Sequence, residues 1–131
     1  MAIKVEGEIE RDFYAMLKQH NFADMLRGSI YRKDMRPPKS REEDAVVSFF
    51  AGFDSQVQTG YITVDVYVPR LNEKIDLERI TALEVELNNF IHYSDLGEYR
   101  VVDGSSMRTY YNEDLNQDFI VARIPFRRYT D

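Results

Sequence analysis

Two apolar runs decide the fold of this chain: Ala45-Val-Val-Ser-Phe-Phe-Ala51 and Tyr61-Ile-Thr-Val-Asp-Val-Tyr-Val68. Both are rich in β-branched and aromatic residues, which suit a pleated, half-buried surface. A short polar loop, bracketed by Gly52 and Gly60, joins them. We therefore predict a β-hairpin. Its second strand alternates strictly between an apolar face and a mixed face.

The first strand of this hairpin is apolar on both faces. Val47 and Phe49 point one way, whereas Val46 and Phe50 point the other way. Such a strand lies centrally in a sheet or under a partner subunit. We expect the domain's own helices to cover one pair, and the pair left exposed marks the place for a neighbour.

The flanking segments complete an α+β pattern. Apolar residues at helical spacing predict helices over residues 6–20 and 76–93, the second capped by Asp76 and followed by a turn at Gly97. Gly28 is read as the stop signal after the first helix. A short strand is predicted at residues 30–32, and further strands at 99–102, 107–111 and 119–126, where Pro125 suggests a sheet edge.

The simplest arrangement of these elements is one α+β domain spanning residues 1–131. It has a mostly antiparallel sheet with two helices packed on one face, because that arrangement buries the apolar stripes of both helices together. A length of 131 residues fits a single domain with its own core.

A basic segment precedes the hairpin in a chain whose net charge is −6. Residues 27–44 contain two consecutive prolines and are predicted to form an exposed, flexible arm, which ends in three acids. We expect the charged residues of this arm to contact another subunit. The alternative is that the arm is only a solvated loop. These residues are Arg32, Lys33, Arg36, Lys39, Arg41, Glu42, Glu43 and Asp44.

Asp65 is a further candidate contact residue outside the arm, because it interrupts an apolar strand. Its carboxylate lies either on the solvent face or against an arginine across a sheet or subunit boundary. The three arm acids alternate in direction on an extended chain, so they do not converge on a metal ion. We expect them to form a solvated turn or ion pairs with the basic arm.

The composition points away from several kinds of chemistry. The chain has no cysteine, and His20 and His92 are not spaced as metal ligands, so we expect no metal site. Phosphate-binding glycine loops and nucleophile elbows are absent, which favours a non-enzymatic protein without cofactors. The acidic balance argues against nucleic-acid binding, and the N-terminus lacks the apolar core of a signal peptide. No apolar run reaches membrane-spanning length, so we expect no membrane partner.

Three stretches of the chain resemble small phage and prophage structural proteins of the tail-terminator or tail-completion type, most closely versions from Bacteroides-type prophages. These stretches are Tyr31-Arg-Lys-Asp-Met-Arg-Pro37, Ser40-Arg-Glu-Glu-Asp-Ala-Val-Val47 and Gln58-Thr-Gly-Tyr-Ile-Thr-Val-Asp-Val-Tyr-Val-Pro69. The expected element order supports the resemblance over most of the chain, whereas the loop from Asp103 to Gln117 matches no recognised pattern.

The resemblance implies an α+β subunit of a ring, often a hexamer, at the head-proximal end of the tail tube. Its partners would be further copies of itself, tail-tube proteins and head-connector proteins, and its location the virion or the bacterial host cytoplasm. In such a ring the arm cations would face Glu42, Glu43 and Asp44 of the next subunit, or the lumen. A head-completion protein, or a protein-binding module of another mobile element or secretion system, is the alternative function.

Overall fold

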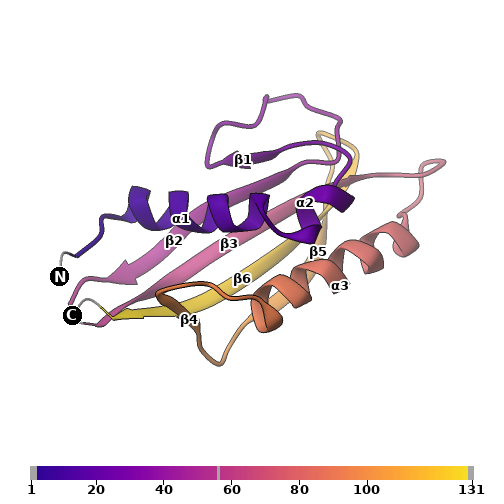
Figure 1. The fold of residues 1–131 in the computed structure, drawn as a ribbon. Helices are drawn as coiled ribbons and strands as arrows, with labels where there is room; N and C mark the ends of the chain where they lie inside the picture. The colour runs from indigo at the N-terminus through magenta and orange to yellow at the C-terminus, as the bar shows by residue number, and fades with distance from the viewer. Residues whose placement is uncertain (1–2, 56, 130–131) are drawn as a thin grey trace.

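The computed structural model describes residues 3–55 and 57–129 and confirms the α+β class. Figure 1 shows two long helices lying across one six-stranded sheet. The helices are α1 (Glu6–Lys18), α2 (Asn21–Met25) and α3 (Leu77–Tyr93). The strands are β1 (Ile30–Arg32), β2 (Ala45–Phe53), β3 (Val57–Pro69), β4 (Tyr99–Val101), β5 (Ser106–Asn112) and β6 (Gln117–Tyr129).

The predicted hairpin forms the antiparallel pair β2–β3 and is longer than expected. Gly52 and Gly60, placed in the loop from the sequence, face each other within the two strands. A Cβ atom on Gly60 would lie 2.5 Å from the carbonyl oxygen of Ala51, so these glycines permit close backbone approach. A bulge between Phe49 and Ala51 shifts the register of β2.

The strand order is β1-β2-β3-β6-β4, and β5 also pairs with β6. The last strand is therefore central, and the edge position inferred from Pro125 is wrong. On the side of β6 away from β3, pairing with β5 ends at Arg123 and pairing with β4 begins at Phe126. Pro125 falls in this gap, where a ladder donor is not required.

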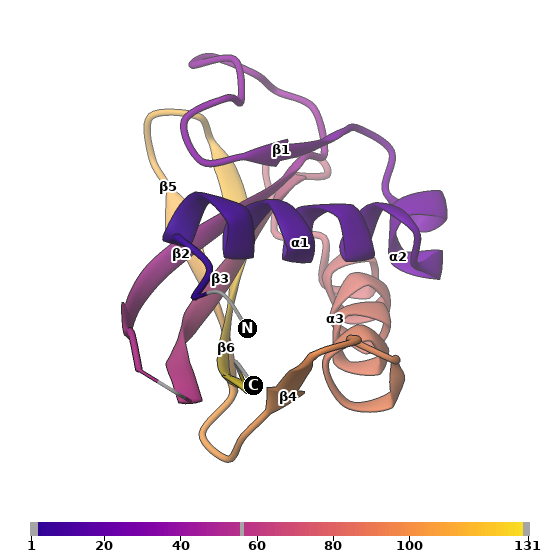
Figure 2. The ribbon, with the colours of Figure 1, turned by 60° about the vertical axis from the view of Figure 1, so that its left-hand side comes forward.

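Both long helices cover the same face of the sheet, as Figures 1 and 2 show. Their apolar stripes meet the inward residues of β2, β3 and β6 in one core, which includes Phe13, Leu87, Val47, Val64 and Ile124. The second predicted helix is confirmed as α3, with the Asp76 carboxylate accepting from the Arg79 N–H at 3.2 Å. Gly97 adopts a φ of 63° in the turn that follows. No helix of the described residues is long and apolar enough to cross a membrane.

The first predicted helix, over residues 6–20, is confirmed as α1, and a further short helix, α2, follows it. Helix α1 ends at Lys18, and the His20 side chain then caps α2 by accepting from the Phe22 N–H at 3.0 Å. Gly28 follows α2 but does not stop a helix by a left-handed turn. It lies where a Cβ atom would meet the Asp44 carboxylate and the Glu43 carbonyl, so the chain passes close to the start of β2 there.

The segment 27–44 lies against the domain. Strand β1 pairs in parallel with the first three residues of β2, and the chain then loops out and returns to begin β2. In Figure 1 this loop lies at the end of the sheet opposite to the two chain termini. Strand β1 also brings the basic side chains of the segment near acids of the same chain.

Candidate interaction surface on the open sheet face

Arg36 anchors the basic segment to the sheet of its own chain. Its Nε donates to Asp44 at 3.0 Å, and its Nη2 donates to the side chain of Gln117 at 3.2 Å. The guanidinium carbon lies 3.9 Å from the centre of the Tyr67 ring, a cation–π distance. Asp44 is 1% exposed and also accepts from the Ser40 hydroxyl at 2.6 Å and the Ser29 N–H at 2.9 Å.

Glu43 is also enclosed within the chain, with 3% of its surface exposed. The Arg79 guanidinium of α3 donates to its carboxylate from Nε at 2.7 Å and from Nη2 at 2.6 Å. The Arg27 N–H donates to the same carboxylate at 2.9 Å. This fork joins the end of the basic segment to helix α3.

Within the chain, Asp44 pairs with Arg36, Glu43 with Arg79, and Arg32 with Glu10 of α1 at 3.0 Å. The pair of Asp44 with Arg36 agrees with the expectation that the arm acids form ion pairs with the basic arm. The contact of these residues with another subunit stays a prediction. The side chains of the predicted set that remain exposed are Lys33, Lys39, Arg41 and Glu42.

The sheet face away from the helices is covered by no described helix, and we call it the open face (Figure 2). Val46 and Phe50 point to this face, whereas Val47 is fully buried beneath the helices. The expectation that one pair of first-strand residues would stay uncovered is met by Val46 and Phe50. The open face comprises Val46, Phe50, Tyr61, Asp65, Tyr67, Arg108, Tyr110, Phe119, Val121 and Arg123.

Aromatic side chains form two groups on the open face. At the end nearest the basic segment, the Phe119 ring stacks on Tyr67 at 5.4 Å and contacts Tyr110 at 5.7 Å. At the other end, Phe50 meets Tyr61 edge-on at 6.4 Å, and the Arg123 guanidinium lies 5.0 Å from the centre of the Phe50 ring. Phe50 is 60% exposed and Tyr110 is 52% exposed. Exposed aromatic rings beside arginine are typical of protein contact surfaces.

Asp65 lies between the two aromatic groups. The register places it directly opposite Val46 on β2 and Val121 on β6, so its nearest cross-strand neighbours are apolar. Among the described residues its carboxylate has no hydrogen-bond or ion-pair partner. Burial without a compensating charge raises the pKa of Asp65 to about 6. The same carboxylate and burial raise the pKa of Tyr67, which the Arg36 charge opposes.

Several residues of this surface were not among the predicted contacts. Arg108, Tyr110 and Phe119 belong to β5 and β6 on the open face, and Arg79 of α3, on the helical side, is the unpredicted partner of Glu43. Alternation in β6 is the signal that could have identified its members: Ile120, Ala122 and Ile124 face the core, so Phe119 and Arg123 must face away. No comparable local pattern predicts the pairing of Arg79 with Glu43, because 36 residues separate them.

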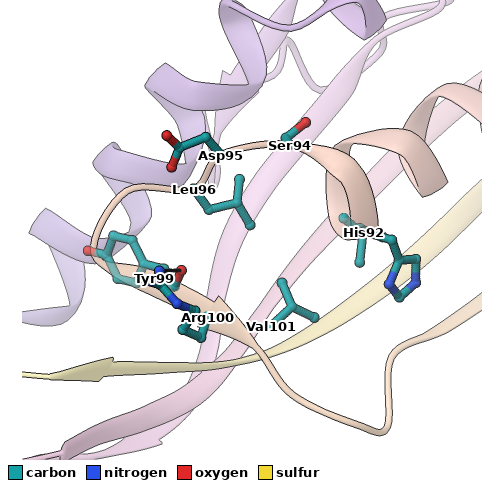
Figure 3. Close-up of a pocket in the computed structure, with 8 residues that line it drawn as sticks. His92, Ser94, Asp95, Leu96, Tyr99, Arg100 and Val101 are labelled. Carbon is teal, nitrogen blue, oxygen red and sulfur yellow. Dashed lines mark hydrogen bonds between the residues drawn. The ribbon is translucent and has the colours of Figure 1, made fainter.

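A hollow of about 370 Å³ lies between the end of α3 and strand β4 (Figure 3). Two of its polar side chains form hydrogen bonds within the loop that follows α3. Asp95 accepts from the Gly97 N–H at 2.9 Å, and Arg100 donates to the Gly97 carbonyl at 2.9 Å. His92 lies across the hollow from Asp95 in Figure 3, so the two do not form an acid–base pair. Over the described part of the chain, no three His, Cys, Asp or Glu side chains are grouped to hold a metal ion.

Neither a protein-family model nor a curated protein matches this chain. The functional conclusion therefore depends on the chemistry of the surfaces described above. Of these, the open face has the largest group of exposed aromatic side chains, and it carries the carboxylate whose pKa is raised to about 6.

Proposed function

We propose that this chain is a non-enzymatic phage or prophage structural protein, a tail terminator or tail-completion subunit that forms a ring at the head–tail junction. The observation that carries the proposal is the open face, an aromatic and arginine-rich sheet surface left uncovered by the helices. Such a surface serves contact with proteins better than binding of a small molecule, for which a concave pocket is usual.

The exposed part of the basic segment supports the same proposal. Arg36 holds the loop on the sheet, and this leaves Lys33, Lys39 and Arg41 pointing away from the domain. A positive loop on a chain of net charge −6 favours contact with an acidic protein surface and fixes the orientation of that contact. In a tail terminator, the acidic surface would belong to the tail tube, the connector or the next copy.

The growth of tail tubes provides a direct test. The proposal requires that the same genome encode a tail-tube protein. That protein is polymerised alone and with the purified chain, and tube lengths are measured by electron microscopy. We expect shorter tubes, with the chain bound at one end. The variant Lys33→Glu/Lys39→Glu/Arg41→Glu should fold normally but cap tubes poorly, because it reverses the exposed charge.

Tubes of unchanged length, with no chain at either end, would contradict the tail-terminator proposal. Asp103→Lys is a matched control, since it changes charge in an exposed turn away from the basic loop. It should cap tubes as well as the unaltered chain does.

The edge of the sheet favours a second candidate, a head-completion protein or a protein-binding module of another mobile element or secretion system. Strand β5 pairs only with β6 among the described strands, which leaves its other edge open to an added peptide strand. Binding to the connector protein without binding to tail tubes would favour this candidate. The same microscopy, with purified connector in place of tubes, separates the two functions.

A further inference from the structure

Side chains of opposite charge lie on the open face without ion-pair partners among the described residues. The Asp65 carboxylate has no hydrogen bond or ion pair among the described residues. Arg108 donates only to the carbonyl of Met107, at 3.4 Å, and Arg123 forms no ion pair with the described acids. Within the described part of the chain, the face therefore has a carboxylate without a cation at its centre and two arginines without an ion pair beside it.

The sheet register explains why Arg123 does not satisfy Asp65 in the same chain. Arg123 lies opposite Thr63, one pair along the strand from Asp65. Its guanidinium is turned toward the far end of the face, where it lies 5.0 Å from the Phe50 ring centre and 6.0 Å from that of Tyr61. The cation of this exposed side chain thus lies beside two aromatic rings.

We propose that the open face binds the open face of a second copy of this chain, so that Asp65 of each copy accepts hydrogen bonds from Arg123 of the other. The inference takes from the proposed function only that the open face is a protein contact, and it names the partner of that face. Two sheets that pack face to face lie about 10 Å apart. An arginine side chain of one sheet can therefore reach a carboxylate of the other.

Charge complementarity favours a second copy over an unrelated protein. The group that Asp65 needs is a cation carried on an apolar, aromatic surface, and Arg123 beside the Phe50 and Tyr61 rings is such a group. A two-fold axis makes each contact twice, so one acid and one base on the same face are both satisfied. The aromatic groups at the two ends of the face supply the apolar area between the ion pairs.

This contact closes after two copies and does not by itself build a ring. An isologous pair uses the same patch on both subunits, whereas a ring needs a second, head-to-tail contact. The exposed loop with Lys33, Lys39 and Arg41 remains free for that purpose. Face-to-face pairing and tube capping can therefore succeed or fail separately.

Analytical ultracentrifugation over a concentration series tests the inference. The unaltered chain should form dimers, and either Asp65→Arg or Arg123→Asp should raise the dimer dissociation constant by about tenfold or more, because each places like charges together. The combined variant Asp65→Arg/Arg123→Asp should recover most of the dimer, since the exchanged charges meet again across the two-fold axis. Circular dichroism establishes that each variant is folded.

Arg11→Asp is the matched control, because it changes the net charge as much as Arg123→Asp does but lies on the exposed side of α1, which covers the opposite face of the sheet. Its dimer dissociation constant should be unchanged. A chain that stays monomeric at every concentration would overturn the inference, as would a double variant no better than the single ones. Neither result would bear on tube capping, which is measured with tail tubes present.

Discussion

Two aspartates beside Tyr67 have opposite surroundings. Asp44 immediately precedes β2, and its carbonyl accepts from the Tyr67 N–H at 2.7 Å, whereas Asp65 lies two residues before Tyr67 on β3. The Asp44 carboxylate is 1% exposed and accepts from Arg36, Ser40 and Ser29. Asp65 is less buried and has no such donor among the described residues, so its pKa is raised to about 6.

The difference arises from the path of the basic segment and not from the strands themselves. Residues 33–44 cross one end of the sheet, and they place the Arg36 guanidinium between Asp44 and the Tyr67 ring. The centre of the open face receives no such segment. The Asp44 carboxylate is therefore buried together with fixed hydrogen-bond donors. The Asp65 carboxylate loses contact with solvent and gains no donor among the described residues in exchange.

The largest expected effect comes from removing the Arg36 side chain, which donates to Asp44 where the basic segment crosses the sheet. Arg36→Ala leaves the enclosed Asp44 charge without its cation and removes the stack on Tyr67. We expect the free energy of unfolding to fall by about 3 kcal/mol, as for other broken buried pairs. Urea unfolding followed by circular dichroism measures the change.

The exposed cation Lys39 provides the control for this variant. Lys39→Ala should change the free energy of unfolding by less than about 0.5 kcal/mol, because an exposed side chain loses little on truncation. Equal losses of unfolding free energy for Arg36→Ala and Lys39→Ala would show that Arg36 does not stabilise the basic segment on the sheet.

A smaller effect of opposite sign is expected at the centre of the face. The pKa of Asp65 is higher in the folded chain than the ordinary value near 4, so folding favours the protonated carboxyl. The stability of the unaltered chain should therefore fall as the pH rises from about 4 to about 6, and it should stay reduced above that range. Asp65→Asn removes this cost, and we expect it to raise the free energy of unfolding by about 2 kcal/mol at pH 8.

Denaturant unfolding at pH 4.5 and pH 8, at concentrations where the chain is monomeric, checks this prediction. The advantage of Asp65→Asn should shrink at the lower pH, where the native carboxyl is largely protonated. Asp103→Asn, in an exposed turn, should show no comparable gain at either pH. A stabilisation by Asp65→Asn that is the same at both pH values would contradict the electrostatic explanation.

The smallest expected effect comes from adding a cation beside Asp65, as Arg36 already lies beside Asp44. Val46 lies directly opposite Asp65 on the open face, so Val46→Arg brings a cation within reach of the carboxylate. A cross-strand ion pair of this kind should stabilise the monomer by about 0.5 kcal/mol. The variant Val46→Gln, whose new side chain is polar but uncharged, should not stabilise the monomer.

A double-mutant cycle with Asp65→Asn isolates this interaction. The gain from Val46→Arg should disappear when residue 65 is asparagine. If the gain persists, the new arginine acts through packing on the exposed rings and not through Asp65.

The main elements of the fold were predictable because their signals are local. The alternation of Ile62, Val64, Val66 and Val68 indicated β3 and its buried face, and Asp76 indicated the start of α3. Local signals were misleading where the deciding contact is distant. Pro125 suggested an edge, yet β6 is central, because the gap between β4 and β5 accommodates the missing donor.

The sequence by itself determined which residues can form the surface: two strand faces, a basic segment, and an acid within an apolar strand. Only the tertiary structure decided their pairing. It assigned Asp44 to Arg36 and Glu43 to Arg79, and it left Asp65 uncompensated on an open face of aromatic rings. Periodicity and caps depend on residues a few positions apart, whereas ion pairs depend on how the chain returns to the sheet. For that reason the sequence indicated the hairpin, and the fold indicated which of its charges have no ion-pair partner among the described residues.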